Sequence, residues 1–314
     1  MENKNTIQDK CPLCHNKDIY DLRKRFEYTL SVCRGCDFMF VKEDFNYSDY
    51  YNRYYFDNYD NPEAFCSNIK NDGTEVSYAD NRNEHKKVYT NILLLLNRFK
   101  KLKNSNLLDV GCAEGYGLLV AKDMGSNVFG VDVSVDAINR CKEKKIRDVY
   151  SGELSELPVR NIDVVIMNDV LEHMRDPNKN LQALNKIMNE SGVVFVKNNL
   201  FSLNSFKNDQ NYFERQFEPP YHCSYFSKKR MIEVFNKHGF KLVYQKPKFV
   251  YYMFELYSFM KRLLSKKQRQ MHCNNKKTRL SKKERNIYST GSFLGRFVNE
   301  FFPSGFVFKK VRNI

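Results

Sequence analysis

Short apolar runs alternate with amphipathic stretches through the middle of the chain. Runs of this length favour buried strands, whereas apolar residues spaced three and four apart favour helices. The pattern predicts strands at 106–110, 127–132, 147–150, 162–167 and 192–197, and helices at 116–125, 135–145 and 177–189. Because strands that alternate with helices form a doubly wound, mainly parallel sheet, we predict an α/β fold.

Two flanking regions complete the predicted sheet. Residues 79–103 carry apolar side chains at helical spacing and predict a helix that covers one face just before the first strand. Downstream, His238-Gly239 is a helix stop signal that leads into a strand at 240–248. Residues 306–311 predict a seventh strand, antiparallel and at the end of the sheet.

The first predicted strand runs directly into a glycine-rich turn that opens the next helix, with the sequence Asp109-Val110-Gly111-Cys112-Ala113-Glu114-Gly115-Tyr116-Gly117. Glycines let the main chain approach a nucleotide-like ligand closely at the carboxyl edge of such a sheet. Asp109 would repel a phosphate, which disfavours a dinucleotide. A cationic, phosphate-free ligand fits this acid better, and S-adenosylmethionine is such a ligand.

Polar residues follow the next three strands at the same edge. Asp132 is placed to accept hydrogen bonds from two ribose hydroxyls, Glu153 suits an adenine amino group, and Asn168 ends the fourth strand. With these residues the chain resembles the class I S-adenosylmethionine-dependent methyltransferases over about residues 80–248, and again at the last strand. The resemblance implies their Rossmann-like seven-stranded sheet and a cofactor site formed by Asp109, Gly111, Cys112, Ala113, Gly115, Asp132, Val133, Glu153, Leu154 and Asn168.

Four of the nine cysteines form two C-x-x-C pairs near the N-terminus, namely Cys11 with Cys14 and Cys33 with Cys36. Four thiolates at this spacing can form a tetrahedral zinc site. So short a stretch has no hydrophobic core of its own and needs a bound metal to stabilise its fold. With all four positions taken by sulfur, the zinc is predicted to be structural. Unrelated cysteines or a redox pair are the alternatives.

Two histidines lie where a methyl acceptor is expected to bind. His173 follows the fourth strand, and His222 lies in the long loop after the fifth. Methyl transfer to oxygen or carbon requires positioning and removal of a proton, and histidine titrates near neutral pH. We therefore predict His222, helped by His173, as the catalytic base. A structural role for the Leu-Glu-His run is the alternative for His173.

A magnesium site is a further alternative at the same place. Asp169, Glu172 and His173 would share one face if a helical turn forms after the strand. The run resembles the acid-x-x-Glu-His segment of ubiquinone-pathway O-methyltransferases, which is implicated in magnesium binding. Here the first acid is Asp instead of Glu, and no fourth ligand is evident.

The whole layout resembles a narrower branch, the zinc-ribbon methyltransferases that act on sugars and related small molecules, including enzymes of surface-polysaccharide biosynthesis. The shared features are the four-cysteine ribbon, a tyrosine-rich link, the core and a His-x-x-Tyr-Phe loop at His222, Tyr225 and Phe226. The sugar C-methyltransferases carry Glu before that histidine, where this chain has Tyr221. O-methylation of a sugar is therefore as well supported as C-methylation.

The charge of +15 raises a rival function, an RNA base methyltransferase with a cysteine ribbon that binds RNA. Residues 241–314 contain 18 Lys and Arg and 3 Asp and Glu, whereas the first 240 residues contain 34 of each. An RNA enzyme is expected to carry basic charge on the ribbon and around the catalytic mouth, so nucleic acid is the weaker alternative. A non-catalytic scaffold is disfavoured because the cofactor positions are intact.

Four regions follow from these features: a zinc ribbon at 1–45, a tyrosine-rich linker at 46–79, the methyltransferase core at 80–248, and a basic insertion with the closing strand at 249–314. Within the last, the apolar and basic residues of 249–285 could contact an anionic membrane surface or a lipid-linked glycan. A packing helix with a basic linker is the alternative. The absence of a secretory signal and of a long apolar run, together with the unpaired cysteines, predicts a cytoplasmic protein, peripheral at the inner membrane face if that contact forms.

Overall fold

The computed structural model describes residues 7–44, 82–246 and 305–311, and the statements below concern these residues. The chain divides into two units, residues 1–244 with 306–314 and residues 245–305. The tyrosine-rich linker at 46–79 and the basic segment at 249–285 lie outside the described residues. Among the described helices, none is both long and apolar enough to cross a bilayer.

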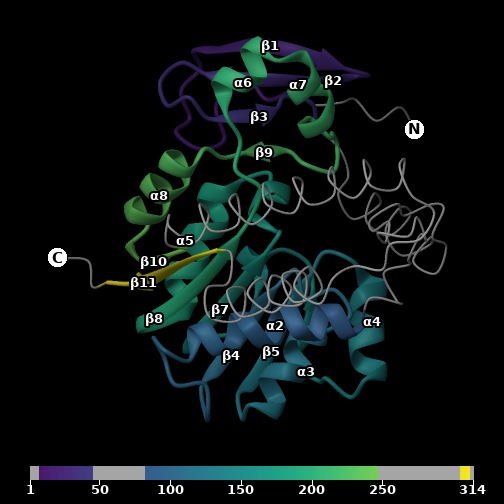
Figure 1. Cartoon of the computed structure of the whole chain (residues 1–314), viewed down its shortest axis with the longest axis vertical. Coiled ribbons are helices and arrows are strands. Elements are labelled where there is room, and N and C mark those ends of the chain that lie inside the picture. The colour runs from purple at the N-terminus through teal and green to yellow at the C-terminus, as the bar shows by residue number, and fades with distance from the viewer. Residues whose placement is uncertain (1–6, 45–81, 247–304, 312–314) are drawn as a thin grey trace, which may run out of the picture. The chain divides into compact units, whose positions relative to one another are not determined.

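A seven-stranded sheet with the order β10-β11-β8-β7-β4-β5-β6 forms the centre of the larger unit (Figure 1). Neighbouring strands from β8 to β6 are parallel, as predicted. This arrangement confirms the predicted α/β, Rossmann-like fold class. The strands are β4 (Asn106–Val110), β5 (Asn127–Asp132), β6 (Val149–Ser151), β7 (Ile162–Asn168), β8 (Met188–Lys197), β10 (Phe240–Gln245) and β11 (Phe306–Lys310).

The last strand differs in place from the prediction. β11 is antiparallel to β8, as expected, but it lies between β8 and β10 instead of at the end of the sheet. Its Val307 and Phe308 are fully buried, which is the environment of an interior strand. β10 therefore forms the sheet edge.

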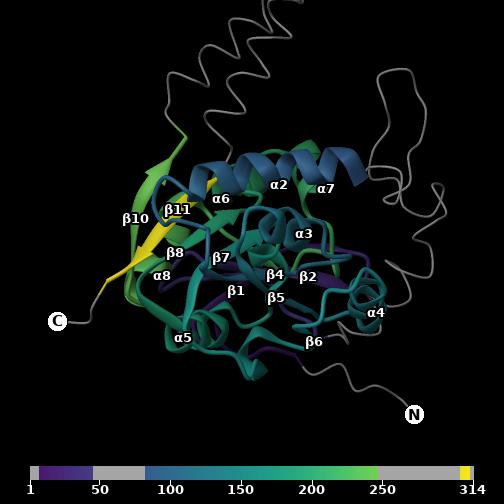
Figure 2. The same cartoon turned by 90° about the horizontal axis from the view of Figure 1, so that it is seen from below.

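Helices cover both faces of this sheet. The helices α2 (Arg82–Leu96), α3 (Tyr116–Asp123) and α4 (Val135–Glu143) contribute to one apolar cluster, and α5 (Pro177–Ile187) and α8 (Lys228–Lys237) contribute to the other. Figure 2 shows α2 and α3 above the sheet and α5 below it. Local sequence sets several of these helix starts: Ser134, Asp176 and Ser227 each accept a hydrogen bond from a backbone N–H of the first turn.

A second, antiparallel sheet with the order β1-β2-β3-β9 is formed mostly by the N-terminal residues. Its strands are β1 (Ile19–Arg25), β2 (Tyr28–Cys33), β3 (Met39–Val41) and β9 (Ser224–Tyr225), and the short helices α6 (Leu203–Asn208) and α7 (Gln210–Gln216) pack on it through a shared apolar cluster. We call residues 7–44 the N-terminal ribbon. Because β9 comes from the loop that carries His222, the ribbon sheet is completed by the core (Figure 1).

The ribbon and the core also share an apolar cluster. Phe38 is fully buried, and its ring centroid lies 4.9 Å from that of Phe226 in the core. The same cluster contains Leu171 and Met174, which follow β7. The two parts of this unit are therefore expected to unfold together.

Phe38→Ala is expected to lower the free energy of unfolding by about 3–5 kcal/mol, because it removes a large buried ring and leaves a cavity. Phe26→Ala is the matched control, since that ring is 76% exposed in the ribbon, and it should change stability by no more than about 0.5 kcal/mol. Urea unfolding followed by circular dichroism measures both. A Phe38 variant as stable as the control would show that the ribbon does not share the core's cooperativity.

Candidate active site

A cavity of about 320 Å³ opens at the carboxyl edge of the parallel strands. It is lined from β4, β5 and β7 and from the segments that follow them, which is where open α/β sheets bind ligands. Among the predicted site residues, the wall contains Gly111, Ala113, Asp132, Val133, Glu153, Leu154, Asn168 and His173. Residues from distant parts of the sequence complete the wall, among them His85, Tyr89, Asp169, Arg175 and Tyr221.

The glycine-rich turn brings bare main chain to this wall. Gly111 has φ +70°, and a Cβ there would lie 2.6 Å from Val170 Cγ2. Gly115 has φ +79°, and a Cβ there would lie 2.6 Å from the Ile146 side chain. Both positions therefore require glycine for conformation and for space. Ala113, between them, also has a positive φ, of 45°.

Asp132 connects the turn to the neighbouring strand. Its carboxylate accepts hydrogen bonds from the backbone N–H of Ala113 and of Ser134, each at 2.9 Å. Burial raises the pKa of Asp132, and these N–H groups oppose the rise. Because a carboxylate has about four acceptor positions, it can still accept hydrogen bonds from two ligand hydroxyls.

Three predicted cofactor residues lie behind the wall instead of on it. Asp109 and Cys112 are buried beneath the turn, and Gly115 begins α3. A Cβ on Gly117 would lie 2.7 Å from Asp109 Oδ2, so the acid is directed under the helix start. Burial raises the pKa of Asp109 well above its ordinary value, and the Tyr89 hydroxyl opposes that rise. The structure therefore associates this acid with support of the turn.

The remaining predicted cofactor residues lie on two sides of the cavity. Glu153 precedes the 3₁₀ turn η3 (Leu154–Glu156), and its carboxylate pairs with Lys179 at 3.2 Å. Asn168 is at the end of β7, where its Nδ2 donates to Asp169 at 3.3 Å. The Asn168 Oδ1 atom is buried and accepts no hydrogen bond from the described residues.

The two predicted catalytic histidines are adjacent, with ring centroids 5.0 Å apart. His173, in the 3₁₀ turn η4 (Leu171–His173), lines the cavity, and its Nδ1 lies 2.6 Å from the Tyr221 carbonyl oxygen. Because a carbonyl can only accept, Nδ1 carries the proton in the neutral ring and Nε2 is the basic nitrogen. His222 is 5% exposed and lies behind the wall, with its Nδ1 3.4 Å from the Glu218 carboxylate.

Burial keeps both rings neutral. It lowers the pKa of His173 to about 4 and that of His222 to about 3, where the neighbouring His173 also contributes. In the same place burial raises the pKa of Glu172 to about 7. A neutral imidazole at the cavity wall can accept a proton at ordinary pH, which is the first requirement for a general base.

The structure does not form the magnesium trio considered from sequence. Asp169 pairs with Lys197 at 2.5 Å, and the three donors that lie within 4.8 Å of one another belong to Glu172, His173 and His222. Two imidazole nitrogens and one carboxylate do not suit Mg²⁺, which prefers oxygen ligands in octahedral geometry. We therefore assign no step to magnesium.

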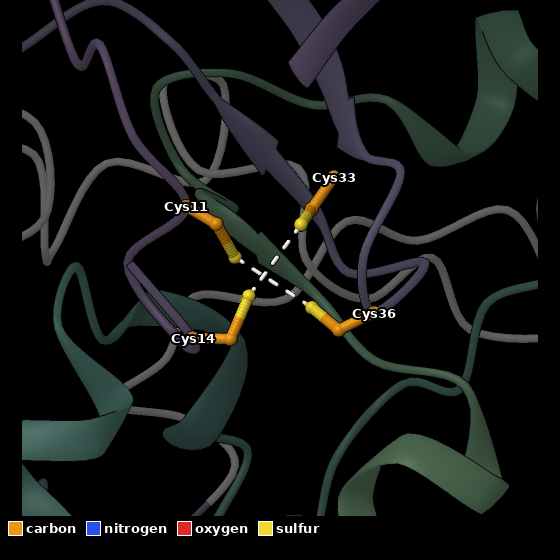
Figure 3. A group of neighbouring side chains, drawn as sticks. All are labelled: Cys11, Cys14, Cys33 and Cys36. Carbon is orange, nitrogen blue, oxygen red and sulfur yellow. Dashed lines mark hydrogen bonds between the residues drawn. The ribbon is translucent and has the colours of Figure 1, made fainter. Parts of the chain in front are cut away.

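The four ribbon cysteines converge on one point (Figure 3). The Sγ atoms of Cys11 and Cys36 are 3.7 Å apart, and those of Cys14 and Cys33 are 3.5 Å apart. A tetrahedral site with Zn–S bonds of about 2.3 Å has sulfur–sulfur edges of about 3.8 Å. Within the cluster, the hydrogen bond between Cys11 and Cys36 lowers the pKa of Cys36, and the same bond together with burial raises the pKa of Cys11. Donor type and spacing both fit zinc.

Sequence reasoning missed several residues of the cavity wall. His85 and Tyr89 come from α2, for which the spacing of the apolar residues predicted only a packing helix. Tyr221 was noted only as a departure from a related motif, and Arg175 carried no signal at all. Each reaches the cavity through tertiary packing, which local periodicity does not report.

The profile of the family described as "Methyltransferase domain" matches residues 77–245, more than half of the chain. The chain belongs to this family. A probable S-adenosylmethionine-dependent methyltransferase of Mycolicibacterium smegmatis is 30% identical over 94 residues, which cover 29% of this chain and 37% of that protein. A ubiquinone biosynthesis O-methyltransferase of Pelagibacter ubique is 27% identical over 103 residues, covering 31% and 43%. The chain thus spans less than half the length of these two relatives.

Among solved structures, magnesium protoporphyrin IX methyltransferase from Synechocystis with bound SAH is similar, with a TM-score of 0.46 and 17% identity over 63% of this chain and 89% of that one. A methyltransferase from Archaeoglobus fulgidus gives a TM-score of 0.44, with 17% identity over 75% of this chain and 96% of that one.

The burial of His222 generates a prediction about stability and pH. Its folded pKa lies below the ordinary value of about 6.5, so the unfolded chain binds more protons between about pH 6.5 and pH 3, and acidification through that window destabilises the fold. From about pH 6 to about pH 5, the wild type should lose about 1.2 kcal/mol more stability than His222→Gln. Urea unfolding at both pH values measures the difference.

The exposed His15 offers the matched control, and His15→Gln should follow the wild type across the same pH range. Equal losses in the wild type and in His222→Gln would contradict the neutral, buried state of His222.

Proposed function

We propose that this protein is an S-adenosylmethionine-dependent methyltransferase that acts on a sugar or sugar-containing small molecule in surface-glycan biosynthesis. The observation that carries the proposal is the presence, on the wall of one cavity, of the glycine-rich turn, the Asp132 carboxylate and His173, whose Nε2 is its basic nitrogen because Nδ1 is bonded to the Tyr221 carbonyl. The turn and the acid fit a nucleoside, and the neutral imidazole fits an acceptor that must lose a proton.

S-adenosylmethionine, when bound, supplies an electrophilic methyl group. Asp132 would accept hydrogen bonds from its ribose hydroxyls, Glu153 and Leu154 would lie at the adenine, and Asn168 Oδ1 would accept from the methionine end. His173 would hold the acceptor's proton at Nε2 while the Tyr221 carbonyl keeps the proton on Nδ1. His222 lies behind His173. It would stabilise the protonated form of His173 only if His222 itself remains neutral.

The charges around the cavity support a small-molecule acceptor over RNA. Three cationic side chains beside it are already paired with carboxylates: Arg175 with Asp44, Lys197 with Asp169 and Lys179 with Glu153. Nucleic-acid binding depends on cations that neutralise phosphates. The alternative of a non-catalytic scaffold is disfavoured because the turn still approaches the cavity with bare backbone.

Both O-methylation and C-methylation remain in the proposal. A relative named as an O-methyltransferase favours oxygen, and the His-x-x-Tyr-Phe loop resembles that of the sugar C-methyltransferases. The proposed contact of residues 249–285 with an anionic membrane or a lipid-linked glycan concerns residues outside those described.

We further propose that Cys11, Cys14, Cys33 and Cys36 bind one structural zinc ion. With four sulfur ligands no position is open for substrate, so the metal would stabilise the fold of the ribbon and take no part in the chemistry.

A label-transfer assay tests the function. Tritiated S-adenosylmethionine is incubated with the protein and, in parallel, with pooled nucleotide-sugars and glycans or with unmodified ribosomal RNA. Label in the sugar pool supports the proposal. Label in RNA would replace it with the RNA function, and label in neither pool while cofactor binds would direct the search to lipid-linked acceptors.

His173→Asn is expected to lower kcat by roughly 10²- to 10⁴-fold, the range for loss of a general base, and His222→Ala is expected to lower kcat through loss of the ring that packs behind His173, while the Kd of S-adenosylmethionine stays unchanged. The label-transfer assay and isothermal titration calorimetry measure the two quantities. An unchanged rate for either variant would remove that histidine from the mechanism. His85→Asn, a change at another histidine of the cavity wall, separates this effect from a general response to losing a histidine.

Zinc analysis of the purified protein should give one equivalent per chain, and Cys33→Ser should abolish it because the tetrahedral set is broken. The same variant is expected to lower the midpoint of thermal unfolding. Cys141→Ser, in the core and away from the cluster, is the control that should retain the zinc. Full stability after complete chelation would contradict a structural role.

A further inference from the structure

Residues 172–175, in the segment after β7, contact both the N-terminal ribbon and the loop that carries His222. Their backbone is bonded to that loop: the Glu172 carbonyl accepts from the Cys223 N–H at 3.0 Å, and the Met174 carbonyl accepts from the Ser224 hydroxyl at 2.6 Å. The loop is bonded to the ribbon in turn, since the Cys223 carbonyl accepts from the Val41 N–H at 2.9 Å. One continuous hydrogen-bonded path therefore joins the ribbon to the wall that carries His173.

Arg175 closes this path from the other side. Its Nη1 donates to the Val41 carbonyl at 3.0 Å, its Nη2 is 3.5 Å from the Lys42 carbonyl, and its Nε is 3.3 Å from the Asp44 carboxylate. When the side-chain amide of Gln8 is flipped so that its oxygen faces Arg175, that oxygen accepts a hydrogen bond from Nε at 2.8 Å. The side chain is only 15% exposed, although it also lines the cavity. A planar guanidinium can serve several acceptors in fixed directions, which an ammonium cannot.

The opposite half of the cavity is held by bonds within the core. Asp132 accepts from Ala113 and Ser134, and the Gly111 N–H donates to the Val131 carbonyl at 2.8 Å. These bonds connect β4, β5 and the turn, and the ribbon takes no part in them. The two halves of the wall therefore have separate supports.

We propose that Arg175 is a positioning residue that fixes the acceptor half of the cavity by clamping Glu172–Arg175 to the N-terminal ribbon. The clamp keeps the Tyr221 carbonyl on His173 Nδ1 and so keeps Nε2 directed for proton transfer. The ribbon then serves acceptor binding, through the wall it supports, and leaves cofactor binding to the core. The kinetic part of this inference rests on the proposed function, whereas its structural part does not.

Arg175→Gln removes both the planar guanidinium and its charge, whereas Arg175→Lys keeps the charge but not the planar group. Arg34→Gln is the matched control, because Arg34 is also a ribbon arginine with a carboxylate partner, Asp18, but is exposed and absent from the cavity wall. In Arg175→Gln we expect the Cys223 and Val41 amides to exchange hydrogen at least about tenfold faster, since local opening becomes easier. The Kd of S-adenosylhomocysteine should stay within about twofold of the wild type.

Two further measurements distinguish positioning from general stability. The ¹⁵N NMR signals of His173 should show the Nδ1–H tautomer in the wild type and in Arg34→Gln, and a mixture of tautomers in Arg175→Gln. With the acceptor pool that takes up label, kcat/KM should fall by about 10- to 100-fold, through kcat as well as KM, because misplacement of a reacting group by about 1 Å has effects of this size. Arg175→Lys should recover only part of this loss.

Unchanged exchange and tautomer in both Arg175 variants would overturn the proposal, as would a loss of cofactor affinity as large as the loss in kcat/KM. If Arg175→Gln does not fold, Arg175→Lys decides the same questions. If label appears in RNA instead of the sugar pool, the proposed function fails, while hydrogen exchange and NMR still decide whether Arg175 acts as the clamp.

Discussion

The parallel register of β4 with its two neighbours is the constraint on which the candidate site depends. Val110 lies opposite Val131 on β5 and opposite Met167 on β7, so all three strands end at the same level. The turn after Val110, the carboxylate of Asp132 and the amide of Asn168 then lie at the same edge of the sheet, and no additional structural element is needed to bring them together. A shift of one residue in strand register would turn each of these side chains to the other face of the sheet. Because it would also expose the buried apolar side chains, their burial fixes the register and with it the site.

Polar groups buried at this edge are costly, and the structure stabilises them in different ways. Asp132 is satisfied by two backbone N–H groups, and Lys144 and Tyr116 both bond to the buried carboxylate of Glu114. The two histidines lose their charge instead, which lowers their pKa values and leaves neutral rings beside the cavity. Burial here favours the uncharged state of both rings, because a buried imidazolium would lose its hydration.

The N-terminal ribbon is a structural part of the core, although the sequence presents it as a separate module. Its sheet takes a fourth strand from residues 224–225, and its Phe38 packs on Phe226 of the same loop. The cysteine cluster at its base is compact enough for a tetrahedral metal. A metal that stabilises the ribbon would therefore also stabilise the wall next to His173, even though its ligands lie outside the cavity.

The sequence alone determined the α/β class, nearly all strand positions in the core and the cysteine cluster, because periodicity, the glycine-rich turn and C-x-x-C spacing are local signals. Only the tertiary structure decided that β11 enters between β8 and β10, that His222 lies behind His173, and that Arg175 joins the ribbon to the cavity. In the structure, His222 instead of Asp169 joins Glu172 and His173 in the group of neighbouring potential metal ligands. These features depend on which distant segments pack together, and packing is a property of the whole fold that no short stretch of sequence encodes.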